Sequence, residues 1–166
     1  HNNGYLRIAT IEDIVILVNH HVKMFKEIIE IDAKQIDDNS YNAMTVSYRK
    51  KLNEQLPVGT CKAWIVFQDG NGHSPIASAA MSIIKMVPTP FDSSYETGYL
   101  HSIYTEKEWR RKGYAELLVK TAIQDASRNS INRIDLTASS QGKKLYDKLG
   151  FQEIKPMMRL YVRNNT

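Results

Sequence analysis

Cysteine and long apolar runs are what this sequence has least of. Cys61 is the single cysteine among 166 residues, so neither a disulfide framework nor a cysteine-based zinc site can form within the chain. A lone cysteine also favours a reducing compartment, and we expect a cytoplasmic protein. Apolar runs such as Ile14 to Val18 fall far short of the ~18 residues that span a bilayer. The opening residues lack a charged, then apolar, then small-residue pattern, so we expect neither a membrane span nor a secretory leader.

The remaining composition is that of an ordinary folded protein. Hydrophobic residues make up 42% of the chain and charged residues 24%, which excludes extensive disorder. At about 150 residues per domain, the length predicts a single domain over residues 1–166. Because the chain starts at His1 rather than Met, we expect residues 1–4 to be a tag remnant or a disordered start.

The net charge of +4 is compatible with a nucleic-acid partner, a smaller anion, or no charged partner. A nucleic-acid surface requires a dense basic stripe with interleaved aromatic residues. The basic residues here are scattered except at 110–112 and 143–144. We therefore expect no nucleic-acid partner, and the two short clusters become the candidates for binding an anion.

Hydrophobic periodicity predicts the order of secondary structure. Apolar residues at three- and four-residue spacing predict helices at 14–29, 40–56, 115–130 and 140–149. Runs rich in β-branched and aromatic residues predict strands at 6–9, 62–67, 76–87, 98–105, 133–138 and 157–162. A meander of strands followed by alternating helices and strands indicates an α/β (α+β) fold with a mixed sheet and helices on both faces.

The stretch from Leu100 to Ala115 combines a strand, a polar turn and a helix start that carries three cations. The unpaired N–H groups and partial positive charge of a helix N-terminus form an anion site. Gly113 lets the backbone approach a bulky anion, because it has no Cβ. The neighbouring cations attract phosphate over a longer range. A helix start with solvated charges is the alternative interpretation.

The hexad Arg-Arg-Lys-Gly-Tyr-Ala at residues 110–115 fits the Q/R-x-x-G-x-G/A pattern of the GNAT superfamily of N-acetyltransferases. A hydrophobic strand ends just before it, and a second strand follows its helix. Tyr146 to Phe151 then looks like the family's Tyr-x-x-x-Gly-Phe ending, and Arg7 to Asp13 looks like its first strand and turn. The chain resembles the family from about residue 6 to 162. The resemblance implies a single-domain GNAT-like fold with a mixed, largely antiparallel central sheet.

The resemblance also implies that acetyl-CoA is the co-substrate. Backbone amides of the hexad would hold its pyrophosphate, and the preceding strand would bind its pantetheine arm and acetyl carbonyl. Ser139 and Lys143 are further candidates, with a helix cap at Ser139 and a solvated face at Lys143 as open alternatives. The expected cofactor-binding residues are Ile103, Tyr104, Thr105, Arg110, Arg111, Lys112, Gly113, Tyr114, Ala115, Ser139 and Lys143.

The resemblance implies direct attack by an amine on the thioester, with Tyr146 protonating the departing thiolate. A phenol with a pKa of about 10 keeps its proton at neutral pH, and a thiolate with a pKa of about 8.5 accepts one. Tyr146 as a core aromatic is the alternative. Glu96 and His101 are the candidates for the general base, although a strand histidine can also be structural. No HExxH or G-x-S-x-G motif is present, so we expect no metal site and no covalent intermediate.

The acceptor is indicated by charge alone. Five acidic residues against one lysine lie between positions 27 and 38, in the segment that lines the acceptor pocket in the family. Glu27, Glu30 and Asp32 are therefore candidate substrate-binding residues, and an ordinary solvated acidic surface is the alternative. The sequence predicts a small-molecule amine or a peptide terminus as acceptor, with a preference for polycationic amines.

Two other classes of function compete with an enzyme of this kind. A nucleotide-dependent enzyme lacks support, because neither G-x-G-x-x-G nor a Walker A sequence occurs. A non-catalytic module could bind acyl-CoA or nucleic acid through the same basic helix start. Relatives in the family are often dimers, which raises the expectation of a homodimer.

Overall fold

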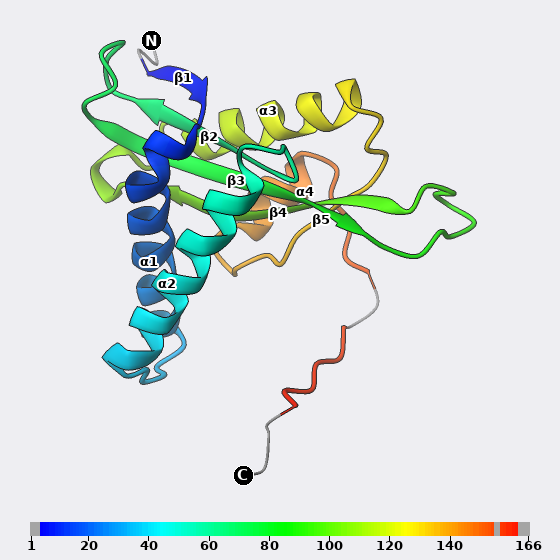
Figure 1. Cartoon of the computed structure of the whole chain (residues 1–166), viewed down its shortest axis with the longest axis horizontal. Helices are drawn as coiled ribbons and strands as arrows, with labels where there is room; N and C mark the ends of the chain where they lie inside the picture. The colour runs from blue at the N-terminus through cyan, green and yellow to red at the C-terminus, as the bar shows by residue number, and fades with distance from the viewer. Residues whose placement is uncertain (1–3, 155–156, 163–166) are drawn as a thin grey trace.

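A five-stranded sheet in the order β1-β2-β3-β4-β5 lies at the centre of the computed structural model, which describes residues 4–154 and 157–162 (Figure 1). The strands are β1 (Tyr5–Ile8), β2 (Cys61–Phe67), β3 (Pro75–Lys85), β4 (Glu96–Thr105) and β5 (Ile134–Asp135). The helices are α1 (Ile14–Ile31), α2 (Asp38–Gln55), α3 (Tyr114–Arg128) and α4 (Lys143–Lys148), with 3₁₀ turns η1 (Ile11–Asp13) and η2 (Lys107–Trp109). The first four strands pair antiparallel, whereas β4 and β5 pair parallel. The predicted mixed, largely antiparallel sheet is confirmed.

The helices cover both faces of this sheet, as the sequence predicts. Helices α1 and α2 lie side by side on one face, where Leu17 and Leu52 are buried with Ile65 of β2 (Figure 1). Helix α3 covers the other face, where Leu118 packs in one cluster with Met81 of β3. Because side chains alternate along a strand, neighbouring residues of the central strands contribute to opposite cores.

The start of α1 is fixed by a short local network. The Thr10 hydroxyl accepts a hydrogen bond from the Glu12 N–H, and the Asp13 carboxylate accepts one from the Thr10 N–H. Arg7 donates two hydrogen bonds to Asp13, at 2.7 and 2.9 Å. This pairing with Arg7 is the main reason that the pKa of Asp13 is lowered. Thr10 thus caps the turn η1, which leads directly into α1.

Strand β4 carries an extra residue that reorients its side chains. Ala80 pairs with His101 and Ser78 with Tyr104, so two residues of β4 lie opposite one of β3. Ser102, inside this bulge, has a φ of 55°, which is unusual for a residue with a side chain. Bulges of this kind bend a strand and redirect a side chain. Here the bulge turns Ser102 toward α1 and α2.

Two predicted strands differ from the structure. Residues 157–162 form no strand, and Leu160 and Val162 are 84% and 85% exposed. The strand predicted at 133–138 is reduced to the two residues of β5. A β-branched or alternating pattern becomes a strand only where its backbone has a partner. The segment 133–138 pairs with β4 only at Ile134 and Asp135, and residues 157–162 have no partner strand in the described ranges. Residues 1–3 of the predicted disordered start lie outside the described residues, whereas Gly4 lies against the sheet near Val66.

Candidate active site

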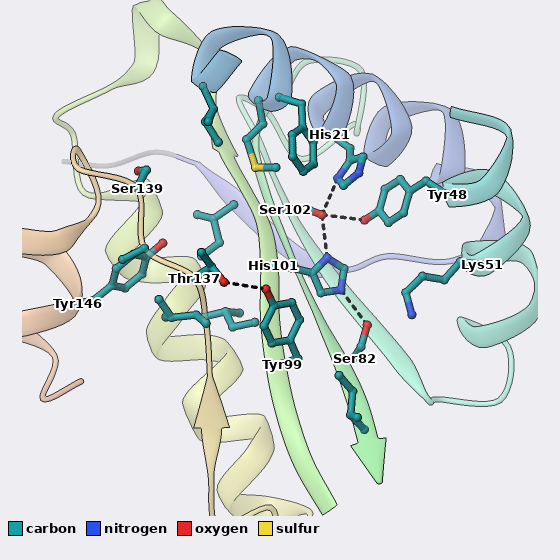
Figure 2. A pocket seen from close by; sticks show the side chains of 18 of the residues that line it. His21, Tyr48, Lys51, Ser82, Tyr99, His101, Ser102, Thr137, Ser139 and Tyr146 are labelled. Carbon is teal, nitrogen blue, oxygen red and sulfur yellow. Dashed lines mark hydrogen bonds between the residues drawn. The ribbon is translucent and has the colours of Figure 1, made fainter. Parts of the chain in front are cut away.

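A cavity of about 1010 Å³ opens between the two parallel strands (Figure 2). Strands β4 and β5 pair at Gly98–Ile134 and Tyr99–Asp135, and then their chains separate. Leu100 to Ile103 line one side of the opening and Leu136 to Gln141 the other. Beyond Tyr99 the backbone of β4 is therefore an open strand edge, with N–H and C=O groups that β5 does not use. An extended ligand can lie along this edge.

The hexad 110–115 lies beyond the end of β4, at the start of α3. Gly113 precedes the helix with a φ of 87°, and Arg111 has a φ of 61°. No side chain of the described residues caps this helix start. The first N–H groups of α3 have no intrahelical partner, so they are available to an anion. The cations of the hexad are not all available, however. Lys112 holds its ammonium 4.5 Å from the centre of the Trp109 ring.

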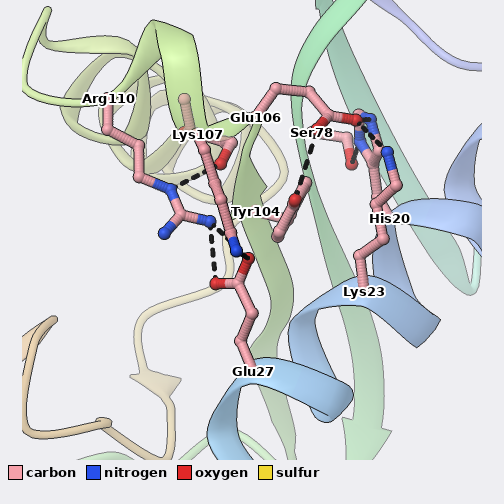
Figure 3. A network of polar contacts seen from close by, with 9 residues as sticks. His20, Lys23, Glu27, Ser78, Tyr104, Glu106, Lys107 and Arg110 are labelled. Atoms are coloured by element: carbon pink, nitrogen blue, oxygen red, sulfur yellow. Dashed lines mark hydrogen bonds and ion pairs between the residues drawn. The ribbon is translucent and has the colours of Figure 1, made fainter.

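Arg110 connects the hexad to α1 rather than extending freely into solvent (Figure 3). Its guanidinium donates to both carboxylate oxygens of Glu27, at 2.9 and 2.8 Å, and to the carbonyl of Thr105 at 2.9 Å. The Lys107 ammonium lies 3.9 Å from the same carboxylate. Glu27, expected to face a cationic acceptor, is therefore already paired with two cations of the loop that precedes α3.

A second contact holds the same loop against α1 (Figure 3). Lys23 donates to the Glu106 carboxylate at 2.6 Å, and the buried His20 ring lies 3.5 Å from it. Burial is the main reason that the pKa of His20 falls to about 4, so the imidazole is neutral at pH 7 and does not form an ion pair with Glu106. Its Nδ1 lies 2.8 Å from the Ser78 hydroxyl oxygen.

The polar wall of the cavity is built from two histidines around Ser102 (Figure 2). The Ser102 oxygen lies 2.8 Å from His21 Nδ1 and 2.7 Å from His101 Nδ1, and it accepts a hydrogen bond from the Tyr48 hydroxyl at 3.2 Å. His101 Nε2 lies 2.8 Å from the Ser82 hydroxyl oxygen. Because a serine hydroxyl donates one proton, Ser102 donates to one imidazole and accepts from the other, which links their tautomers.

Both imidazoles of this wall are neutral. Burial lowers the pKa of His21 to about 4, and burial together with the Lys51 ammonium lowers the pKa of His101 to about 3. Neutral histidines accept or donate hydrogen bonds without adding charge to the cavity. With so low a pKa, His101 holds an abstracted proton only weakly, so it is poorly suited to act as a strong general base.

Tyr146 faces the histidine wall from the other side of the cavity (Figure 2). Its ring packs edge-on against Phe151, with centroids 5.7 Å apart. A Cβ on Gly142 would lie 2.8 Å from the ring, so the glycine leaves the space that the tyrosine occupies. Burial raises the pKa of Tyr146 above its usual value. The hydroxyl therefore keeps its proton at neutral pH and can donate it.

The other predicted site residues are distributed unevenly. Among the lining residues that the structure describes are Ile103, Ser139 and Asp32, but not Glu96, Glu30 or Lys143. Glu96 pairs with Lys85 at the far end of β4, and Glu30 is exposed. Ser139 accepts a hydrogen bond from the Gly142 N–H at 3.2 Å, and Lys143 pairs with Asp147 and Glu153 at 3.0 and 3.3 Å. Tyr104 is buried beside His20 instead.

Several lining residues were not predicted. Tyr48, Lys51 and Gln55 recur at spacings of three and four residues along α2, which places them on one helix face. That periodicity is a usable signal. No sequence pattern predicts Ser102 as a lining residue, because its left-handed backbone and the bulge arise from strand pairing.

Residues 4–154 and 157–162 contain neither a metal-binding cluster nor a membrane-spanning helix. No cluster of three or more histidine, cysteine or carboxylate side chains that could hold a metal ion occurs in these ranges. No helix within them is both long and apolar enough to cross a bilayer.

The fold and site define an α/β protein with a cavity along the open edge of a strand and an uncapped helix start just beyond that strand. A model of the acetyltransferase (GNAT) family matches residues 24–151. The chain belongs to the GNAT acetyltransferase family, which uses acetyl-CoA as its acetyl donor.

Solved structures support this assignment at the level of the fold. A predicted acetyltransferase of Clostridium acetobutylicum, solved with acetyl-CoA, is 25% identical, with a TM-score of 0.82 over 95% of this chain and 96% of that one. A GCN5-related N-acetyltransferase of Ralstonia eutropha JMP134 is 23% identical, with a TM-score of 0.83 over 95% and 98%. A Trypanosoma brucei acetyltransferase is 16% identical, with a TM-score of 0.63 over 96% and 99%.

Proposed function

We propose that this protein transfers the acetyl group of acetyl-CoA to a primary amine of a small molecule or peptide terminus, by direct attack in a ternary complex. One observation carries the proposal: the open edge of β4 lies between a protonated Tyr146 and a neutral, polar wall built on Ser102. A donor along the edge and an acceptor against the wall would meet in a single cavity.

The donor site follows from the same geometry. The open edge from Leu100 to Ile103 offers backbone groups to an extended arm. The uncapped start of α3, with Gly113 in a left-handed conformation, fits a pyrophosphate approaching the backbone. Arg110 braces this loop through Glu27, so we assign it a positioning role.

The reaction needs a group that protonates the departing sulfur and a route by which the amine nitrogen loses a proton. When the donor is bound, its thioester supplies an acetyl carbon to which the amine nitrogen bonds as the carbon–sulfur bond breaks. Tyr146 gives its proton to the departing sulfur, since a phenol remains protonated at neutral pH and a thiolate is a suitable acceptor. After attack the amine nitrogen releases one proton to solvent, and Tyr146 regains one from solvent, so that the products are the amide and the free thiol. His101 and Ser102 orient the amine. Because His21 and His101 have low pKa values and hold an abstracted proton only weakly, the ammonium form of the acceptor loses its proton to solvent and the free base attacks.

The charge of the cavity limits the predicted preference for polycationic amines. Asp32 lines the cavity, but Glu27 is paired with Arg110 and Lys107. Two lysines, Lys51 and Lys85, also line it. The cavity lining thus has no excess of unpaired carboxylates, and support for a polycationic acceptor rests mainly on Asp32. Polyamines therefore enter the test as one arm rather than as the expected substrate.

Release of free thiol from acetyl-CoA, measured with a broad panel of amines, tests the proposal. We expect turnover with at least one amine, and we expect acetyl-CoA but not NAD to raise the melting temperature. Stabilisation by acetyl-CoA without thiol release from any amine would instead support a non-catalytic acyl-CoA-binding module. Stabilisation by nucleic acid alone would support the nucleic-acid-binding alternative.

A further inference from the structure

Lys51 of α2 differs from Lys50, the other lysine of that helix, in its surroundings. It is half-buried and lines the cavity, and its ammonium donates to the Gln55 side-chain oxygen at 2.5 Å. No carboxylate of the described residues lies within 4.0 Å of it. Its neighbour Lys50 is 76% exposed, with Glu54 at 4.0 Å. The ammonium of Lys51 therefore brings a positive charge into the cavity that no acidic side chain of the described chain balances.

The surroundings of Lys51 do not share or cancel that charge. His21, Tyr48 and His101 are neutral, and Ser82 is a hydroxyl. Partial burial strengthens the attraction between an ammonium and an anion, because fewer water molecules screen it. A ligand with an anionic group would thus gain a direct partner at Lys51.

The position of Lys51 relative to the reacting groups fixes which part of a ligand it would bind. Figure 2 shows Lys51 and Tyr146 on opposite sides of the cavity, with His101 between them. Helix α1 contributes the apolar side chains of Met24, Phe25 and Ile28 to the lining of the same cavity. An acceptor with its amine toward Tyr146 would place its other end near Lys51.

We propose that Lys51 is a specificity-determining residue, and that the preferred acceptor is an amine that also bears a carboxylate, with an apolar body between Lys51 and the reacting centre. A single ammonium matches the single charge of a carboxylate, and the Gln55 amide beside it can add a hydrogen bond. The inference rests on the proposed acetyltransferase activity, since it names the substrate class of the same cavity.

Matched acceptor pairs test this inference. Amino acids in which an apolar body separates the amine from the carboxylate, such as ε-aminocaproate and para-(aminomethyl)benzoate, are compared with their amides, which keep the amine and the apolar body but lose the negative charge. Thiol release is measured with wild type, Lys51→Gln, Lys51→Arg and the control Lys50→Gln. We expect Lys51→Gln to raise KM for the carboxylates by roughly tenfold to a hundredfold, the usual size of a lost charged hydrogen bond. Its KM for the amides should change less than about twofold, and Lys51→Arg should restore most of the difference.

Comparison of each variant with wild type on the same acceptor cancels the different amine pKa values of acids and amides. Equal KM effects of Lys51→Gln on both members of a pair would indicate a structural role and overturn the inference. So would turnover of the amides alone or of polyamines alone by the wild type. Absence of thiol release with every amine, while acetyl-CoA still stabilises the protein, would overturn the proposed function itself, and the inference with it.

Discussion

Replacing Tyr146 by phenylalanine removes one hydroxyl and leaves the rest of the site in place. The packing on Phe151 and the space provided by Gly142 involve the ring, which the variant keeps. Within the described residues the hydroxyl has no hydrogen-bond partner in the protein. We therefore expect the free energy of unfolding to change by less than about 1 kcal/mol, and the affinity for acetyl-CoA to stay within about twofold.

The rate should respond much more strongly. Loss of a positioned general acid costs about 100- to 10,000-fold in rate, or roughly 3 to 5 kcal/mol. The assay is steady-state thiol release, together with a thermal-shift titration of acetyl-CoA on the same samples. Tyr99→Phe is the matched control, because its hydroxyl lies in the same cavity but contacts Thr137 at 3.1 Å. We expect Tyr99→Phe to keep kcat within about threefold of wild type.

A kcat for Tyr146→Phe that matched the control would refute the argument, because the phenol would then not supply the proton. A loss of kcat accompanied by an equal loss of acetyl-CoA affinity would also refute it. That result would assign Tyr146 to donor binding.

Three further predictions follow from other contacts. Gly142→Ala should lower kcat about tenfold or more, because the new methyl displaces the Tyr146 ring; unchanged kcat would contradict this. Glu27→Gln should raise KM for acetyl-CoA several-fold with little effect on kcat, since it frees the Arg110 guanidinium that braces the loop; a titration with acetyl-CoA checks it. Because the pKa of buried His20 is lowered from 6.5 to about 4, the unfolded chain takes up its proton first as pH falls. The His20 contribution to stability, on the order of 3 kcal/mol, is complete above about pH 6.5 and is lost toward pH 4. Melting temperatures measured from pH 7 to pH 4 should therefore fall, and a flat profile would contradict this.

Local patterns in the sequence predicted most of the fold. The apolar spacing from Ile14 onward and from Ala115 onward predicts α1 and α3, whose starts lie within one residue of the prediction. Predictions from hydrophobic periodicity succeed here because each of the two helices buries one continuous apolar stripe against the sheet. They fail at 157–162, where the residues are suited to a strand but have no partner strand in the described ranges. A strand depends on a second segment in a way that a helix does not.

The candidate site was less accessible to sequence reasoning. Resemblance to a family indicated Tyr146 and the glycine of the hexad. Tyr146 lines the cavity along the open edge of β4, and Gly113 immediately precedes the uncapped start of α3. Charge counting indicated Glu27 as a free acceptor-binding carboxylate. The structure pairs it instead with Arg110, 83 positions away along the chain. Counts of charge along a sequence do not reveal such pairs, because the chain brings distant charges together.

The sequence by itself determined the class of fold, the family and the position of the helix start that we propose as the anion site, since these depend on local periodicity and on a short motif. Only the tertiary structure decided what the cavity is like. A bulge in β4 turned Ser102 toward two histidines from different elements, and burial made those histidines neutral. The same packing left Lys51 without an acidic partner in the described residues. Burial and contacts between distant residues set the charge of this cavity, and local sequence reveals neither of them.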